Sequence, residues 1–171
     1  MSFYTGWYAE RNDIIVDRVV QRLRHNTIID IAAGSTYLAR RLLARPEITR
    51  YAWNDLNLSI LNGFGENESR FEVWPFDANQ PPLMDAWDVV ICVSLEHLEH
   101  DIRLLEGVKP GAFLALGSPN FMCKGHVRSF KSRREFGARY EAYVNIEEIA
   151  ELNNGNLRKF VLFGEKKPRG I

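Results

Sequence analysis

The sequence has 171 residues, and its 22 Lys and Arg are balanced by 22 Asp and Glu. This length suits one domain with a sizeable core, and the neutral balance excludes a chain that coats nucleic acid or an anionic membrane with its whole surface. Hydrophobic residues at 46% and charged residues at 26% are typical of a globular protein. No repeat or Gly/Ser linker divides the chain, so we expect a single domain over residues 1–171.

The first half of the chain alternates helical and strand patterns. Apolar residues recur at helical spacing in the first segment, and a short β-branched run then leads into a loop of small residues. Pro46 ends the next helical pattern. Helices are predicted over 12–24, 37–45 and 59–61, and strands over 27–31, 51–55 and 71–76.

The second half continues the alternation. The run 88–93 is apolar on both faces, as in a parallel strand covered by helices. Strands are predicted over 88–93, 112–116 and 157–163, and helices up to about 108 and over 133–140 and 146–152. This order predicts a three-layer, Rossmann-like α/β fold, with a mostly parallel sheet of about six strands and helices on both faces.

In such sheets ligands bind at the carboxyl ends of the strands, and Asp30, Asp55, Asp77 and Ser94 all fall there. A dinucleotide site needs Gly-x-Gly-x-x-Gly after the first strand, which residues 32–37 do not supply.

The segments that carry these acids resemble, in order, the motifs of class I S-adenosylmethionine (SAM)-dependent methyltransferases. Residues 28–36 (IIDIAAGST) resemble the first strand and its small-residue loop, and Asp55 and Asp77 resemble the acids that end the second and third strands. Residues 87–98 (WDVVICVSLEHL) and 104–114 (LLEGVKPGAFL) resemble the fourth strand and the turn into the fifth. The resemblance implies SAM as cofactor, S-adenosylhomocysteine as product and a methyltransferase activity.

Each expected cofactor contact has a physical reason. Small residues let backbone N–H groups approach a ligand, and a carboxylate at a strand end can accept both ribose hydroxyls. We assign the ribose to Asp55, the adenine amino group to Asp77, and the loop or the methionine amine to Asp30. The expected cofactor-binding residues are Asp30, Ala32, Gly34, Thr36, Asp55, Leu56, Asp77, Ala78, Cys92 and Val93.

The loop departs from the family, whose three glycines are reduced here to Gly34. Ala32 is tolerable if its φ is negative, whereas β-branched Thr36 cannot adopt a positive φ cheaply. This departure predicts weakened cofactor binding. It also supports an alternative in which the protein has the SAM fold but no catalysis and acts as a binding or regulatory partner.

Two histidines are the candidates on the acceptor side. His97 follows the fourth strand, where it could take a proton from an acceptor, and His126 lies in a segment that resembles the family's lid. The alternative for Glu96-His97 is a cap for the following helix. Small-RNA 2′-O-methyltransferases of this fold bind a divalent metal through Glu-x-x-Glu-His and a later His, but Val93 stands where the first Glu belongs, so the sequence predicts no metal.

Residues 124–140 carry six Lys and Arg against one Glu. This segment predicts a small, anionic acceptor, and a nucleic-acid acceptor tracked through phosphates is the alternative. A solvated helix face balanced by later acids explains it equally well.

The remaining expectations concern size and location. Only about 55 residues follow the fifth predicted strand, which predicts a trimmed sheet with an open acceptor side and a partner or homodimer to cover it. No apolar run has the length of a membrane span, no secretion signal opens the chain, and the two cysteines are consistent with a reducing compartment. We therefore expect a cytoplasmic protein with no membrane partner.

Overall fold

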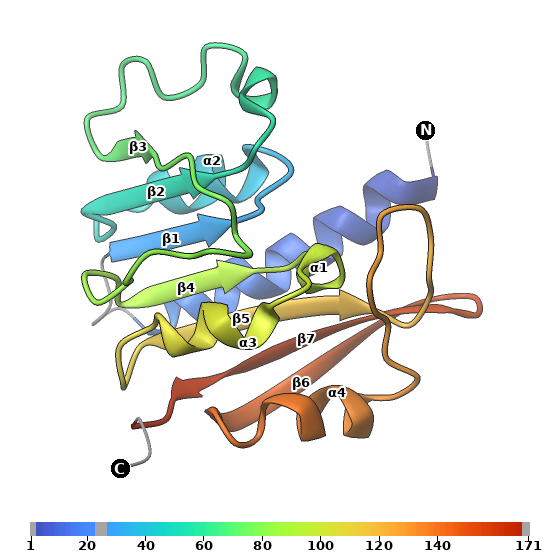
Figure 1. The fold of residues 1–171 in the computed structure, drawn as a ribbon. Helices are drawn as coiled ribbons and strands as arrows, with labels where there is room; N and C mark the ends of the chain where they lie inside the picture. The colour runs from blue at the N-terminus through green and yellow to red at the C-terminus, as the bar shows by residue number, and fades with distance from the viewer. Residues whose placement is uncertain (1–2, 23–26, 169–171) are drawn as a thin grey trace.

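The computed structural model describes residues 3–22 and 27–168, and it has the predicted α/β architecture (Figure 1). One seven-stranded sheet has the order β3-β2-β1-β4-β5-β7-β6, in which β7 pairs antiparallel with both β5 and β6 and all other pairs are parallel. The strands are β1 (Thr27–Ile31), β2 (Arg50–Asn54), β3 (Phe71–Val73), β4 (Val89–Cys92), β5 (Phe113–Pro119), β6 (Val144–Asn154) and β7 (Leu157–Lys166). The predicted fold class is thus confirmed, with seven strands instead of about six.

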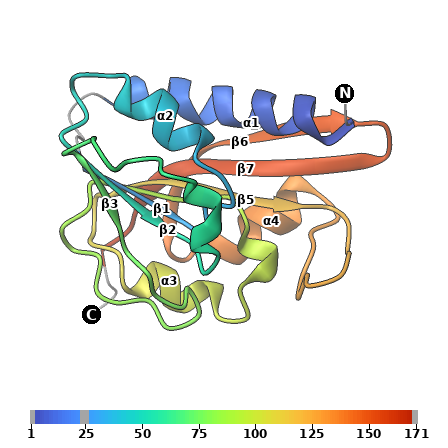
Figure 2. The ribbon, with the colours of Figure 1, turned by 90° about the horizontal axis from the view of Figure 1, so that it is seen from above.

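Helices cover both faces of this sheet (Figure 2). The first two helices lie on one face and the later two on the other, because successive strand residues point to opposite sides and are apolar on both. Ile28 and Ile91 belong to the core under the first pair, whereas Ile29 and Cys92 belong to the core under the second. The helices are α1 (Phe3–Val20), α2 (Tyr37–Leu43), α3 (Asp101–Glu106) and α4 (Arg133–Tyr140), with 3₁₀ turns η1 (Leu58–Leu61) and η2 (Leu95–His97).

The closing hairpin corrects two expectations. Residues 146–152, predicted as a helix, lie within β6, and the sheet is not trimmed. A β-bulge between Ile146 and Glu148 interrupts the alternation of apolar residues, so Ile146, Ile149 and Leu152 imitate a helical spacing. The neglected signal was Asn154-Gly155, a strong hairpin turn, in which Gly155 has φ +60°. The hairpin extends the sheet beyond β5, and the homodimer expected to cover the acceptor side stays a prediction.

Helix α1 begins nine residues earlier than its predicted start at residue 12. Its first turns therefore reach the edge where β1, β2, β4 and β5 end (Figure 1). No helix among residues 3–22 and 27–168 is long and apolar enough to cross a membrane.

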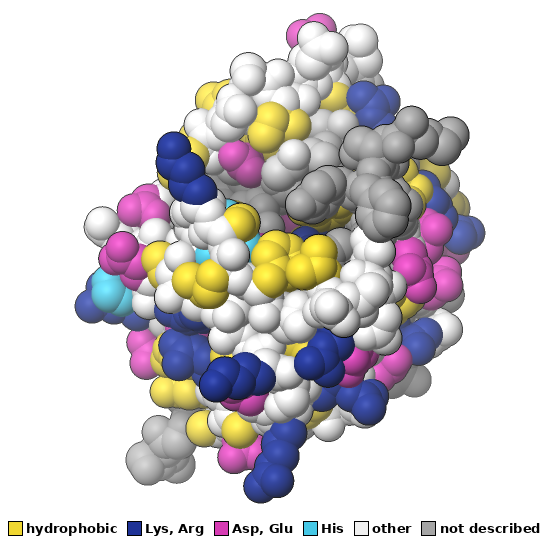
Figure 3. Space-filling model, turned by 90° about the vertical axis from the view of Figure 1, so that its right-hand side faces the viewer, with side chains coloured by type: hydrophobic (Ala, Val, Ile, Leu, Met, Phe, Trp, Pro, Cys, Tyr) yellow, Lys and Arg dark blue, Asp and Glu magenta, His cyan; other side chains and the backbone are white. Residues whose placement is uncertain are grey.

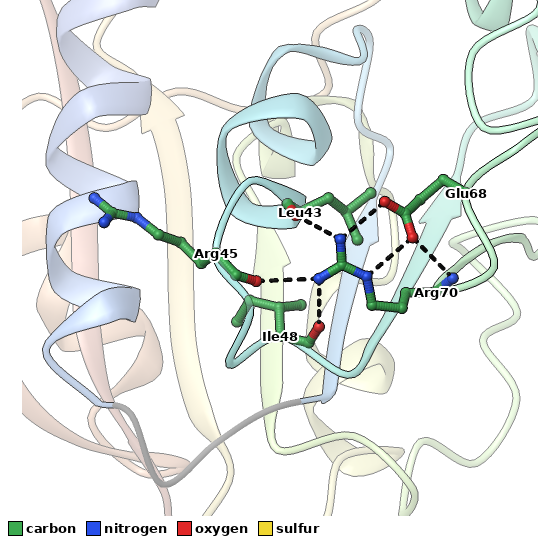
Figure 4. Close-up of polar contacts among 5 residues, drawn as sticks. All are labelled: Leu43, Arg45, Ile48, Glu68 and Arg70. Atoms are coloured by element: carbon green, nitrogen blue, oxygen red, sulfur yellow. Dashed lines mark hydrogen bonds and ion pairs between the residues drawn. The ribbon is translucent and has the colours of Figure 1, made fainter.

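Arg70 holds the end of α2 against the start of β3 (Figure 4). Its guanidinium donates to the backbone carbonyls of Leu43, Arg45 and Ile48 at 2.7–3.1 Å and pairs with Glu68 at 2.9 Å. These carbonyls follow a helix end, where they have no partner inside the helix. A single side chain therefore satisfies three backbone acceptors.

Arg70→Ala is expected to lower the free energy of unfolding by about 2 kcal/mol, because the partly buried carbonyls of Leu43 and Ile48 lose the guanidinium as donor and Glu68 loses its ion pair. Urea denaturation of the variant measures this loss. Arg45→Ala is the matched control, since Arg45 contributes only its backbone carbonyl and its side chain points away in Figure 4. Equal stabilities for the two variants would contradict the role assigned to Arg70.

Candidate functional site

Two adjoining cavities lie at the carboxyl ends of β1, β2 and β4. The smaller has a volume of about 340 Å³ and the larger about 610 Å³. They share Gly34, Ser94 and His97 as lining residues. Figure 3 faces this edge and shows a histidine side chain beside apolar side chains near the middle of the face. His97 therefore stands where the two cavities meet.

Three loops form the smaller cavity, and polar side chains hold them together. Asp55 accepts from the backbone N–H groups of Gly34 and Asn57, each at 2.8 Å. Asn54, which is buried, donates to the carbonyls of Trp74 and Phe76 at 2.8 and 2.9 Å. The loops after β1, β2 and β3 are thus tied to one another at the end of β2. Asn54 was not among the predicted residues, although its place directly before Asp55 at a strand end was visible in the sequence.

The predicted cofactor residues divide into two groups. One group lines the smaller cavity. In the other group, Asp30, Cys92 and Val93 are buried in or directly after strands, and Thr36 is half-buried at the start of α2. The lining residues are Ala32, Gly34, Asp55, Leu56, Asp77 and Ala78, and those that line neither cavity are Asp30, Thr36, Cys92 and Val93.

Asp30 is fully buried below the first loop. Burial raises the pKa of its carboxyl to about 7, against the hydrogen bond that the hydroxyl of Tyr51 donates to Oδ2 at 2.8 Å. Its Oδ1 has no hydrogen-bond partner among the described residues. Asp30 is therefore placed to support the loop, not to line the cavity.

The conformation of the first loop reverses the expectation for two of its residues. Thr36 has φ −93° and is unstrained at the start of α2, whereas Ala32 has φ +52°. We expected Ala32 to be tolerable in the loop at a negative φ, and its observed φ is positive. Gly34 has φ +65°, and apart from its chain neighbours a Cβ there would meet no atom of the described residues within 4 Å.

Ala32→Gly is expected to raise the free energy of unfolding by about 0.5–1 kcal/mol, because relief of the left-handed backbone outweighs the extra chain entropy of glycine. Gly34→Ala, the reciprocal change, should lower it by about 1 kcal/mol. Thermal and urea unfolding of both variants give the comparison. Destabilisation by Ala32→Gly would show that the alanine is not strained.

Glu96, His97 and His126 form a cluster beside the cavities. Nδ1 of His97 lies 3.0 Å from the carbonyl of Gly125, which can only accept, so Nδ1 carries the hydrogen and Nε2 is the acceptor. His126 is fixed in the same way by the carbonyl of Phe121 at 3.1 Å. The two predicted histidines are brought together, with their ring centroids 4.9 Å apart.

This cluster could hold a divalent cation. One ligand atom from each of Glu96, His97 and His126 lies within 4.8 Å of the others. Glu96 is buried, and its Oε2 has no hydrogen-bond partner among the described residues. Two histidines and one carboxylate are a common ligand set for divalent transition metals, with open positions left for a substrate.

The basic segment 124–140 lines neither cavity, and three of its six Lys and Arg form ion pairs within the protein. Arg128 and Arg139 both form ion pairs with the buried carboxylate of Asp101, to which Arg139 donates two hydrogen bonds of 2.6 Å. Arg133 pairs with Glu151 at 3.3 Å. The Lys and Arg of this segment therefore do not line the site, contrary to the expectation of a basic lid.

Sequence reasoning missed Arg11 and Asn12 of α1. Tyr8, Arg11 and Asn12 line the larger cavity, and Arg11 is buried despite its charge. The only signal was the polar pair Arg11-Asn12 ahead of an apolar stripe, which does not distinguish a site from a solvated turn.

Comparisons with known proteins identify the fold. No family model matches the sequence, and no curated protein matches it. Among solved structures, the N-methyltransferase NodS from Bradyrhizobium japonicum WM9 superposes with a TM-score of 0.76 at 12% identity, over 96% of this chain and 99% of that one. Magnesium protoporphyrin IX methyltransferase (ChlM) from Synechocystis PCC 6803, solved with bound S-adenosylhomocysteine, gives 0.76 at 12% identity over 98% and 89%.

The methyltransferase domain of the bacterial protein CtHen1 gives a TM-score of 0.69 at 13% identity, over 92% of this chain and 98% of that one. At these identities the likeness establishes the fold. The chain has the fold of SAM-dependent methyltransferases.

Proposed function

We propose that this chain binds SAM in the smaller cavity and transfers its methyl group to a small acceptor in the larger one. The observation that carries the proposal is the junction of the two cavities at Gly34, Ser94 and His97. A donor and an acceptor held in adjoining cavities meet at one point, and such positioning accounts for much of the acceleration of a displacement reaction.

The residues of the smaller cavity fit the adenosine part of SAM. Asp55 lies at the end of β2, where its carboxylate can accept from ribose hydroxyls, and Asp77 and Ala78 lie at the next loop for the adenine ring. The open space beside Gly34 leaves room for a ligand against the backbone. SAM, when bound, supplies a methyl group activated by a sulfonium.

His97 is our candidate for taking the acceptor's proton. Its Nδ1 hydrogen is engaged by Gly125, so Nε2 is free to accept. His126 contacts the edge of the His97 ring and serves to position it. Glu96 offers a buried carboxylate nearby, which would favour the charge that His97 gains.

A specific observation favours a cation-assisted variant of this activity as the second candidate. The ligand atoms of Glu96, His97 and His126 converge within 4.8 Å without the further Glu that the sequence comparison demanded. Calorimetric titration with Mn²⁺ and Zn²⁺ tests it, and Glu96→Gln should abolish any binding. If neither ion binds, the cation-assisted variant is refuted and the proposal of metal-free methyl transfer is kept.

The alternatives raised by the sequence are separated by ligand binding. A nucleic-acid acceptor is less favoured, because Arg128, Arg133 and Arg139 are engaged in ion pairs. A flat dependence of RNA and DNA affinity on salt would exclude it. A protein that binds SAM but releases no S-adenosylhomocysteine with any acceptor would fit the catalytically inactive alternative.

Isothermal titration calorimetry with SAM and S-adenosylhomocysteine tests the proposal directly. We expect both to bind with one site per chain. Absence of binding at millimolar ligand would refute both the methyltransferase and the SAM-binding proposals. The cytoplasmic location and the single-domain organisation are proposed with this function.

A further inference from the structure

Exposed hydrophobic side chains are concentrated at the edge of the sheet that carries the site. Among the side chains that the structure describes, the large exposed ones lie at the carboxyl ends of the strands with one exception, Leu83. Leu56 and Leu58 follow β2, beside the smaller cavity, and the others belong to α1, α2, the loop after β5 and the tip of the hairpin. Figure 3 faces this edge and shows hydrophobic side chains around the middle of the face. Apolar side chains that gather in one area, and are not scattered singly, mark a binding surface.

Two of these side chains line the larger cavity, and cations hold both rings in place. Tyr8 is 40% exposed, and the guanidinium of Arg11 and the ammonium of Lys159 lie 4.9 and 4.3 Å from its ring centre. Tyr37 is 37% exposed, and Arg41 donates to its hydroxyl at 3.0 Å with the guanidinium 5.7 Å from the ring centre. Cation–π contacts orient a ring that stays in contact with solvent. The larger cavity therefore has two oriented aromatic walls.

Further apolar side chains continue from these walls towards the surface. Leu157 lies two residues before Lys159 on β7, and residues two apart on a strand point to the same face. Leu157 therefore follows Lys159 and Tyr8 towards the hairpin turn. Met122, which is exposed, lies in the loop after β5 that also carries His126. The apolar rim is defined here as Tyr8, Tyr37, Met122 and Leu157.

The polar groups of the larger cavity lie at its inner end. Ser94 and His97 stand where this cavity meets the smaller one, and Nε2 of His97 can accept a proton. Arg11 is the only Lys or Arg among the described residues that line the cavity, and it is engaged: Nε and Nη2 donate to Oδ1 of Asn12 at 3.0 and 2.8 Å. The cavity is thus polar where a methyl group would be transferred and apolar towards the surface.

We infer that the acceptor is an amphiphile, whose hydroxyl or amine reaches His97 while its apolar body lies against Tyr8 and Tyr37 and extends over Met122 and Leu157. This acceptor class rests on the proposed function. It differs from the anionic acceptor that the basic segment 124–140 predicted, and that segment lines neither cavity. An apolar body gains affinity from each group that it removes from water, and aromatic walls add a contribution from ring contacts.

The experiment measures how phenol, para-ethylphenol, para-butylphenol and para-hexylphenol bind to protein saturated with S-adenosylhomocysteine. Calorimetry is done on the wild type, on Met122→Ser, on Leu157→Ser and on Leu83→Ser. Leu83 is the matched control, because it is exposed and lies before β4 at the opposite edge of the sheet, where Met84 pairs with Val108. We expect one site per chain and an affinity that rises about 2–4-fold with each added CH₂ group.

The variants should divide according to the length of the probe. Met122→Ser and Leu157→Ser should leave phenol unchanged and weaken para-hexylphenol by about 3–10-fold, whereas Leu83→Ser should change neither. Tyr8→Ala should weaken phenol itself by about 3–10-fold, because the ring contact is lost. Thermal unfolding checks the fold of this last variant, and the three exposed positions test the acceptor class without it.

The opposite results would overturn this acceptor class. These are an affinity of the wild type that does not rise with chain length, or an equal loss in Leu83→Ser and in the two rim variants, which indicates non-specific adsorption. Binding to phosphatidylcholine vesicles that Met122→Ser and Leu157→Ser abolish, together with a flat phenol series, would make the apolar rim a membrane-contacting surface instead. Failure of SAM and S-adenosylhomocysteine to bind the wild type would refute the proposed function and the acceptor class with it. Cofactor binding with a flat phenol series would refute the acceptor class alone.

Discussion

Replacing Asp55 by alanine is expected to weaken SAM binding by about 100-fold or more while the protein stays folded. Both carboxylate oxygens are directed at loop backbone in the free protein, and they retain lone pairs for ribose hydroxyls. Two charge-assisted hydrogen bonds contribute about 1.5–3 kcal/mol each, and their loss accounts for the factor. The same change releases the amide of Gly34, which loosens the loop against which the ligand lies.

Calorimetry with SAM measures the effect, and thermal unfolding verifies the fold. Asp85→Ala is the matched control, because Asp85 is exposed and lies outside both cavities. Asp55→Asn should be intermediate, since an amide oxygen can still accept from Gly34 but carries no charge. Normal SAM affinity in Asp55→Ala would refute the assignment of this residue to the ribose.

The positions of Asp55 directly after β2 and of Asp77 in the loop after β3 were predictable from sequence for a geometric reason. Parallel strands of one sheet end at the same edge, so Asp55 and Asp77 had to lie near the loop of Gly34 once the strands were recognised. The same periodicity argument failed at β6, where the bulge at Ile146 and Glu148 removes the alternation on which it depends. The long antiparallel pairing with β7 then decides the structure, as tertiary context often does for strands.

Contacts between distant segments were beyond sequence reasoning. Arg11 reaches the site because α1 starts early and packs beside the carboxyl edge, which no local pattern encodes. His97 and His126 meet because the backbone N–H of Val127 donates to the carbonyl of Glu96 at 2.7 Å and holds the two loops together. The positive charge of the segment 124–140 led to a wrong expectation for the same reason. Two of its arginines, Arg128 and Arg139, form ion pairs with Asp101, which lies on another helix.

Asp101→Ala is expected to lower the free energy of unfolding by about 3 kcal/mol, because it leaves two partly buried guanidinium groups without their carboxylate. Asp101 is 1% exposed and accepts from Arg139 and from the hydroxyl of Tyr140 at 2.7 Å, besides its ion pair with Arg128. This one side chain ties α3 to α4 and to the loop that carries His126. Urea denaturation at pH 7 measures the loss, and Glu99→Gln is the control, because Glu99 is exposed and only its backbone carbonyl contacts Arg128.

A second variant, Asp101→Asn, distinguishes an ionic role of Asp101 from simple packing through the pH dependence of its stability relative to the wild type. The two arginines and the tyrosine hydroxyl outweigh burial and lower the pKa of Asp101 from 3.8 to about 2. A carboxyl whose pKa falls on folding stabilises the fold above its unfolded pKa, and this contribution disappears as the pH falls through the folded value. The stability gap between wild type and Asp101→Asn should therefore be constant above about pH 5 and shrink by about 2 kcal/mol between pH 4 and 2. A gap that does not change over this range would mean that Asp101 acts through its shape and hydrogen bonds and not through its charge.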